Sequence, residues 1–275
     1  MNRNPDLALE LKTKGNVFFG KGDFTAAEGL YSKAIVADPY NHLLYNNRAI
    51  SRLKLRFFEA CIEDCMASLD LSPEALKPTY YISQAQLELG NTEEALTTAK
   101  KAHEMCLKTK EYKSLPAITQ HVLRCKKEHW DQQEKRRIHQ DRQLENDTLE
   151  MMLQSKANDL EGVDNESDKK EIEKEWKTKM DRLSAIFEVA KAKSEQRRTV
   201  PDWAIDDISF GIMIDPVMTK SGKSYERASI MEHLKHQEND PLTREPLCVD
   251  DLRPNLDLKA ACEEFLDNNG WAVDW

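Results

Sequence analysis

Small residues recur every 34 positions through the first third of the chain, and this repeat constrains the fold more than any other feature. The three series are Ala27, Cys61 and Ala95; Ala34, Ser68 and Ala102; and Gly15, Ala49 and Ser83. Pro39 and Pro73 also lie one period apart. Small residues at regular positions let two antiparallel helices approach closely, and a proline ends the second helix of a pair. The period therefore predicts stacked helix pairs.

A period of 34 residues with two helices in each unit is that of tetratricopeptide (TPR) repeats, which coil into a solenoid with a concave inner surface. We predict three such repeats within residues 1–112. The first helix of each pair lines the inner surface, where residues three and four apart share a face. This register places the following residues there: Lys12 and Asn16 from the first repeat, Asn47 from the second, and Lys77 and Tyr81 from the third. Lys54 lies near the end of the second repeat's first helix.

These inner-face residues predict a binding site for an acidic chain end. Two or three ammonium groups and two carboxamides converge on one groove, and such donors suit a terminal carboxylate with a second acidic group beside it. The alternative is that they only face water, as exposed Lys and Asn side chains on helices usually do. Four polar positions at matching register on one concave face favour the ligand site.

Residues 113–198 predict a long helical hairpin, similar to a coiled coil. Glycine and proline are rare here: Pro116 suits a helix start, and Gly162 lies in the acidic segment "LEGVDNESD", which predicts a turn. The second helix carries an apolar stripe with gaps of three and four residues. Its members are Ile172, Trp176, Met180, Leu183, Phe187 and Ala190.

The hairpin is predicted to be the dimerisation region, with its stripe packed against a second copy to give a homodimer. Two alternatives are an intramolecular hairpin without a partner and a single solvated helix. Nucleic-acid binding is an alternative for the segment "KKEHWDQQEKRR", but acids alternate with its bases, and the whole chain has a net charge of −9. A solvated helix face is favoured, and no nucleic-acid partner is expected.

The cysteines predict neither a zinc site nor disulfides. They stand at positions 61, 65, 106, 125, 248 and 262, without a Cys-x-x-Cys pair, so free thiols are expected. The N-terminal sequence lacks the apolar core of a signal peptide, and no apolar run approaches the ~18 residues that cross a bilayer. We therefore expect a cytosolic or nuclear location and no membrane partner.

Residues 199–275 predict a small α+β domain. "KSGKSY" is typical of a hairpin between short strands, "YERASIMEHLKHQ" predicts a helix, and "NDPLTREPL" predicts a second loop. The segment "NLDLKAACEEFLDNNG" predicts a final helix, with Gly270 as its C-terminal cap. The expected order is loop, hairpin, helix, loop, helix.

This last segment resembles the U-box, a zinc-free relative of the RING fold. The resemblance rests on "SGKSYER", "DPLTREPL" and the "PN" and "LK" that follow. His233, His236, Cys248 and Cys262 lack the paired spacing of a zinc site, so no metal or cofactor is expected. Hydrogen bonds and ion pairs must hold the loops instead. The candidate residues are Asp215, Lys220, Ser221, Glu226, Arg227 and Asp240.

The U-box resemblance implies a surface for a ubiquitin-conjugating enzyme charged with ubiquitin, and no nucleophile. Ile208, Phe210 and Pro241 would present an apolar patch, Arg244 would bridge enzyme and ubiquitin by charged hydrogen bonds, and His233 would support this surface. The alternatives are core packing for Ile208 and Phe210, a surface ion pair for Arg244, and a structural hydrogen bond for His233.

The whole chain resembles the CHIP family of chaperone-associated ubiquitin ligases. "KTKGN", "NNRA" and the Lys77 segment are similar to that family's carboxylate clamp, and "RRIHQ" and "NGW" extend the match. The resemblance implies that Lys12, Asn16, Asn47 and Lys77 hold the last residue of a heat-shock chaperone's acidic tail. Tyr80 and Tyr81 would line a pocket for an apolar residue of that tail.

The function that this resemblance implies is that of a ubiquitin-protein ligase and co-chaperone. It would mark misfolded, chaperone-bound client proteins for degradation as part of protein quality control. The alternative is a non-enzymatic dimeric adaptor whose last domain only binds proteins. The presence of Ile208, Phe210, Pro241 and Arg244 favours the ligase.

Overall fold

The computed structural model describes residues 3–194 and 199–275, with the side chains of 191–194 left undescribed. The predicted limit between hairpin and last domain, at residue 198, lies outside these residues. The chain divides into two compact units, one of Met1–Trp130 with Asp202–Trp275 and one of Asp131–Pro201. No helix in the described part combines the length and apolar character that crossing a membrane requires.

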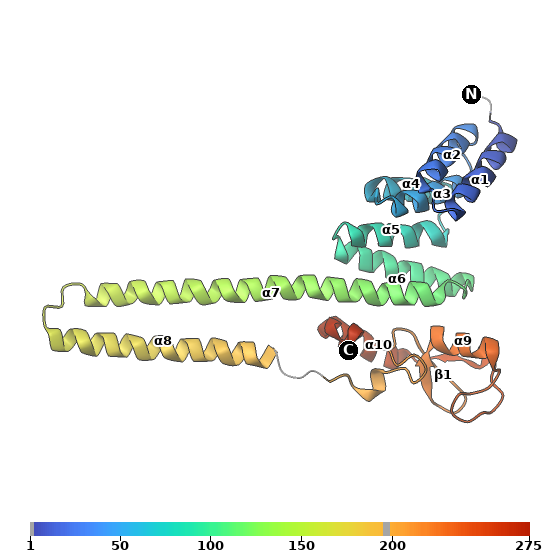
Figure 1. Cartoon of the computed structure of the whole chain (residues 1–275). Coiled ribbons are helices and arrows are strands. Elements are labelled where there is room, and N and C mark those ends of the chain that lie inside the picture. The colour runs from blue at the N-terminus through green and yellow to red at the C-terminus, as the bar shows by residue number, and fades with distance from the viewer. Residues whose placement is uncertain (1–2, 195–198) are drawn as a thin grey trace. The chain divides into compact units, whose positions relative to one another are not determined.

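Helices α1 to α6 form three pairs that follow one another along the chain (Figure 1). Their bounds are Pro5–Gly20, Phe24–Ala37, His42–Lys54, Phe58–Leu71, Leu76–Glu88 and Thr92–Thr109. Side chains cap several of them: Asn4 accepts from the backbone N–H of Leu7, and Asp23 from that of Ala26. Such caps satisfy amide groups that a helix N-terminus leaves without partners.

The small residues of the 34-residue period lie at the helix contacts, as predicted. Ala27, Cys61, Ala95, Ala34, Ser68, Ala102 and Ala49 are all 0% exposed. At Gly15 the contact is with an aromatic ring: a methyl group there would lie 2.6 Å from Cε1 of Tyr31. The helix pairs can therefore approach this closely only with small residues at these positions.

Helix α7, Leu115–Leu160, and helix α8, Glu166–Ser194, form the long antiparallel hairpin (Figure 1). Gly162 lies in the turn with φ 84°, a conformation that glycine adopts without strain. Trp176 donates from Nε1 to Oδ2 of Asp159 at 2.9 Å, which ties the two helices together near the turn. The predicted stripe is half-buried from Ile172 to Phe187, and Ala190 is exposed.

The last domain holds a three-stranded antiparallel sheet of order β2-β1-β3. Strands β1, β2 and β3 span Pro216–Met218, Ser224–Glu226 and Arg253–Pro254; helices α9 and α10 span Arg227–His236 and Leu256–Asn268. Short 3-10 helices lie at Asp202–Ala204, Val249–Asp251 and Gly270–Asp274. Its core consists of Val217, Tyr225, Ile230, Leu234 and Leu247. The predicted fold class, mainly α with a small α+β domain, is confirmed.

The prediction that Gly270 caps the final helix is wrong. Helix α10 ends at Asn268, and Gly270 begins the 3-10 helix that follows. A side chain at Gly270 would collide with Cβ of Trp130 on α7. Glycine is needed here because another helix approaches the backbone closely, which the local sequence does not indicate.

Within the first compact unit, the last domain packs on the third repeat. Leu76, Ala102, Cys106, Leu115 and Ile118 form one apolar cluster with Ala228 and Met231 of α9. The six cysteines are free thiols, five of them buried and Cys248 exposed. This agrees with the expectation of a chain without disulfides.

Candidate functional site

Two predicted clamp residues, Asn16 on α1 and Asn47 on α3, lie in direct contact. Nδ2 of Asn47 donates to Oδ1 of Asn16 at 3.3 Å, and the hydroxyl of Tyr31 donates to the same oxygen at 2.8 Å. Tyr31 is only 2% exposed, so a rigid group orients the Asn16 carboxamide. Because Oδ1 already accepts two hydrogen bonds, the exposed Asn16 can offer its amide N–H groups to a ligand.

The predicted clamp lysines differ from their neighbours in their ion pairing. Among the residues that the structure describes, none of Lys12, Lys54 and Lys77 forms an ion pair, whereas Lys14 on the same helix as Lys12 pairs with Glu10 at 2.6 Å. Lys12 is half-buried, and Lys54 and Lys77 are exposed. These ammonium groups therefore leave positive charge available for an anionic ligand.

The two tyrosines that were predicted to line the clamp lie in different surroundings. Tyr80 stacks edge-on against His121 at 5.3 Å between ring centroids and lines an open groove with Gln84 and Arg124. Tyr81 packs against the buried cluster around Ala49, and burial raises the pKa of its hydroxyl to about 12. Both rings are half-buried, and of the two Tyr80 lines the groove.

In the last domain, a buried aspartate fastens the loop that carries Ile208 and Phe210. Oδ2 of Asp206 accepts from N and Oγ of Ser209 at 2.9 and 2.6 Å, and Oδ1 accepts from the backbone of Glu226 at 3.0 Å. The backbone N–H of Phe210 donates to the Asp206 carbonyl at 2.8 Å. This turn holds Phe210 at φ 57°, which a residue with a side chain rarely adopts.

The second loop, around Pro241 and Arg244, repeats this construction. Oδ1 of Asp240 accepts from the backbone of Leu242 at 2.8 Å, and Oδ2 accepts from Oγ of Ser221 at 2.8 Å. The backbone N–H of Arg244 donates to the Asp240 carbonyl at 2.9 Å, and Arg244 has φ 65°. Buried carboxylates thus pin two loops that metal ions pin in zinc-dependent folds.

The two loops hold apolar side chains out in solvent. Phe210 is 74% exposed and Leu242 67% exposed, while Ile208 and Pro241 are half-buried. The alternative of core packing is therefore wrong for Phe210, whereas Ile208 does pack against the domain core. Arg244 is exposed and forms no ion pair with any described residue, which contradicts the surface ion-pair alternative. Exposed apolar side chains and a guanidinium without an ion pair among the described residues are groups suited to docking a protein.

His233 has a structural hydrogen bond, the alternative that the sequence left open. Its Nε2 lies 3.0 Å from the backbone oxygen of Asn239, just before the second loop. It therefore braces the start of that loop from helix α9.

The other candidate loop-holding residues also take part in hydrogen bonds and ion pairs, whose partners the sequence did not predict. Nε of Arg227 lies 2.6 Å from Oδ2 of Asp215, and Lys220 pairs with Asp251 at 2.8 Å. Oε2 of Glu226 accepts from the backbone N–H groups of Ile214 and Asp215. In residues 3–194 and 199–275, no group of three or more His, Cys, Asp or Glu side chains could hold a metal ion.

Sequence reasoning missed three residues of these sites: Asp206, Leu242 and Tyr31. The signal for Asp206 is a spacing that the two loops share. Asp206 precedes "DISF" and Asp240 precedes "PLTR", and a hydroxyl residue, Ser209 or Thr243, stands three positions after each aspartate. Leu242 is an apolar residue within a loop of polar residues and prolines. For Tyr31, no local pattern reveals a hydrogen bond to a residue on the preceding helix.

Comparisons with known proteins agree with this architecture. Residues 200–271 match the U-box domain family. The E3 ubiquitin-protein ligase CHIP of Arabidopsis thaliana is 29% identical over 271 residues, 97% of this chain and 95% of that protein. The Hsp70/Hsp90 co-chaperone CNS1 of Saccharomyces cerevisiae is 35% identical over 34% of this chain and 26% of its own length.

A likeness to a solved structure covers the repeats. The first TPR of Spaghetti (RPAP3), bound to the HSP90 peptide SRMEEVD, is 30% identical with a TM-score of 0.38, over 44% of this chain and 98% of that chain. The chain carries a U-box domain, and its repeats, helical hairpin and U-box together fit the CHIP family of ubiquitin-protein ligases.

Proposed function

We propose that this protein is a U-box ubiquitin-protein ligase and co-chaperone. Its last domain docks a ubiquitin-conjugating enzyme charged with ubiquitin, and its repeats bind the acidic C-terminal tail of a heat-shock chaperone. Misfolded clients of that chaperone then lie close to the thioester, and ubiquitin passes to their lysines. The acceleration comes from proximity and orientation, without a covalent intermediate on this chain.

The observation that carries the ligase proposal is that two loops fastened by buried carboxylates expose Phe210 on the first, and Leu242 and Arg244 on the second. A strained backbone costs about 1–3 kcal/mol at each such position, and strain of this kind clusters at functional sites. The apolar pair would bind the conjugating enzyme, and the guanidinium would orient ubiquitin by charged hydrogen bonds.

The test of the ligase is an in-vitro reaction with activating enzyme, ubiquitin and a panel of conjugating enzymes. We expect Phe210→Ala to reduce ubiquitin-chain formation at least tenfold by weakening enzyme binding. Arg244→Ala should slow transfer while leaving that binding within about twofold. The matched control is Leu256→Ala, which removes an apolar side chain that is 71% exposed at the start of α10, outside the two loops. If the wild type forms no product with any enzyme of the panel, the protein is an adaptor and not a ligase.

The clamp proposal rests on the contact between Asn16 and Asn47 and on the three lysines that have no acidic partner among the described residues. An ionised carboxylate at the end of a peptide would accept from these ammonium and amide groups together. Each charge-assisted hydrogen bond contributes roughly 1.5–3 kcal/mol. Losing one should therefore weaken peptide binding roughly 10- to 100-fold.

Calorimetry with the peptide SRMEEVD tests the clamp. Lys12→Ala should weaken binding by that factor, and the peptide with an amidated C-terminus should bind as poorly to the wild type. Lys14→Ala is the matched control because Lys14 lies on the same helix, paired with Glu10. Equal affinity for free-acid and amidated peptides would rule out recognition of the chain end.

We also propose that the hairpin forms a homodimer. Ile186 and Val189 on α8 are 65% and 68% exposed. They lie three residues apart, on one face of the helix, so a second copy could cover both. Light scattering should give twice the chain mass for the wild type and one chain mass for the double variant Ile186→Glu with Val189→Glu. Lys177→Glu, on the same helix, should remain dimeric.

A cytosolic or nuclear location is proposed for the protein and can be checked by imaging.

A further inference from the structure

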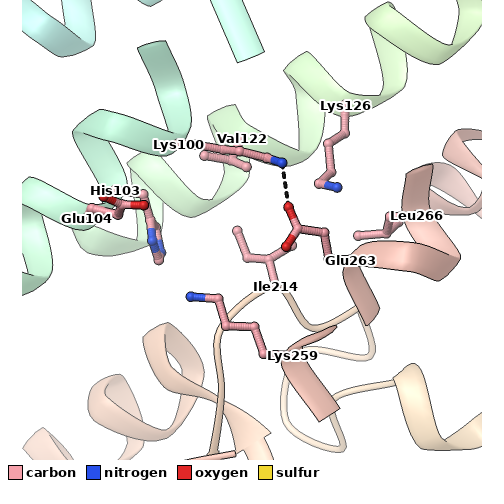
Figure 2. Close-up of a pocket in the computed structure, with 9 residues that line it drawn as sticks. All are labelled: Lys100, His103, Glu104, Val122, Lys126, Ile214, Lys259, Glu263 and Leu266. Carbon is pink, nitrogen blue, oxygen red and sulfur yellow. Dashed lines mark hydrogen bonds and ion pairs between the residues drawn. The ribbon is translucent and has the colours of Figure 1, made fainter. Parts of the chain in front are cut away.

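A cavity of about 110 Å³ lies between the third repeat, the first turns of α7 and the last domain (Figure 2). It belongs to neither proposed binding site. Its polar lining consists of Lys100, His103 and Glu104 from α6, Lys126 from α7, and Lys259 and Glu263 from α10. Since a single water needs ~10–15 Å³ of such volume, the cavity has room for a small ion.

One lining residue, His103, has a buried ring nitrogen to which no described residue is hydrogen-bonded. Its side chain is only 6% exposed, and its buried Nε2 has no partner among the described residues. Burial lowers the pKa of this imidazole, which favours the neutral ring. The charged groups around it are Asp215, Lys259, Arg227 and Glu104. Leaving a buried polar atom without a partner is costly, and a bound ligand that reaches this nitrogen would offset that cost.

The lysines around the cavity have more hydrogen-bond donors than their acidic partners use. Lys126 is 5% exposed and pairs at 2.5 Å with Asp267, whose own side chain is 54% exposed. Lys259 reaches only Asp215 within the described part of the chain, at 3.5 Å, and Arg227 already holds that carboxylate at 2.6 Å. Each ammonium carries three N–H donors.

The third lysine, Lys100, pairs with Glu263 at 2.5 Å (Figure 2). Three ammonium groups thus face two carboxylates in the lining itself, Glu104 and Glu263. Lys126 is buried, while Lys100 and Lys259 are each 39% exposed. Ammonium groups that are only partly paired favour an anion nearby, and a metal cation would be repelled.

We propose that this cavity binds a free, doubly charged oxyanion of the phosphate class. Lys259, Lys126 and Lys100 would donate to its oxygens, and His103 would complete the ligand shell through Nε2. Because these residues come from α6, α7 and α10, the bound anion would fasten the third repeat to the last domain. The binding of a chaperone tail at the clamp does not enter this proposal.

The experiment is isothermal calorimetry of the full chain with inorganic phosphate at fixed ionic strength, with sodium chloride as the reference salt. We expect one saturable site per chain. Lys259→Met should weaken phosphate binding at least tenfold. Lys101→Met is the matched control, since Lys101 is exposed on the same helix as Lys100 but does not line the cavity.

The proposed clamp is also cationic, so a second variant separates the two sites. Lys12→Ala combined with Lys77→Ala should leave phosphate affinity unchanged if the cavity is the site. Hydrogen exchange of α10 should slow in phosphate for the wild type and not for Lys259→Met. If phosphate does not bind saturably, or if the clamp double variant abolishes binding while Lys259→Met retains it, the proposal is wrong. Either result leaves the clamp and ligase proposals untouched.

Discussion

Replacing Glu226 by glutamine should stabilise the U-box above neutral pH and leave it unchanged in acid. Glu226 ends strand β2 and is 5% exposed. Burial is the main reason that the pKa of its carboxyl is raised from 4.5 to about 7. Two backbone hydrogen bonds, from Asp215 and Ile214, lower this pKa, whereas the nearby carboxylates of Asp215 and Asp206 raise it. Its Oε1 has no hydrogen-bond partner among the described residues.

The magnitude follows from that pKa. At ~1.4 kcal/mol for each pH unit, ionising Glu226 in the folded domain costs about 3 kcal/mol more than in the unfolded chain. A carboxyl whose folded pKa is raised contributes stability that is fully present below its unfolded pKa. That stability is lost as the pH rises through the folded value. The domain should therefore lose stability between about pH 4.5 and pH 7.

The glutamine side chain of Glu226→Gln would imitate the protonated carboxyl at every pH. Its amide oxygen can accept the backbone N–H groups of Ile214 and Asp215, and its amide N–H groups would lie on the side of the present Oε1, near the acidic neighbours. The variant should match the wild type at about pH 5 and exceed it by up to about 3 kcal/mol at about pH 8. Contributions from other titrating groups are shared by both proteins and cancel in the comparison.

Hydrogen exchange of the whole chain, followed by mass spectrometry of the peptide that contains β1 and β2, measures the free energy of opening at each pH. The matched control is Glu232→Gln on α9, where the carboxylate is exposed and pairs with Lys235. That variant should gain no stability at the alkaline end of the series. Parallel pH curves for wild type and Glu226→Gln, or a Glu226→Gln protein less stable than wild type in alkali, would refute the reasoning.

Two further substitutions test the packing and the loops. Gly15→Ala should destabilise the repeats by about 1–3 kcal/mol because its methyl would overlap the Tyr31 ring. Gly29→Ala on the next helix is the control, because its added methyl group would have no atom within 4 Å. It should be neutral or stabilising by up to about 1 kcal/mol. If thermal unfolding gives the two variants the same stability, the packing argument is wrong. Asp240→Ala removes the acceptor for the Leu242 backbone and for Ser221, so ubiquitin transfer should fall at least tenfold while circular dichroism of the repeats stays unchanged. Unimpaired transfer would mean that the loop does not depend on this carboxylate.

Much of the architecture was determined by the sequence alone, because its signals are local or periodic. Ala27, Cys61 and Ala95 predicted the helix pairs, since only small residues tolerate such close contact at a fixed spacing. The "SGKSY" and "DPLTREP" segments predicted the hairpin and the second loop through turn chemistry that acts within a few residues. The same local reasoning failed at Gly270, whose role depends on a helix far away in the chain.

The chemistry of the sites was decided only by the tertiary structure. No sequence pattern shows that Tyr31 orients Asn16, or that buried Asp206 and Asp240 turn Phe210 and Arg244 outward in the left-handed region. The ion pairs around the cavity join residues that are far apart in the chain, such as Lys126 and Asp267, separated by 141 positions. Burial, partner and orientation of a polar group depend on which distant residues the fold brings against it, and neither periodicity nor propensity carries that information.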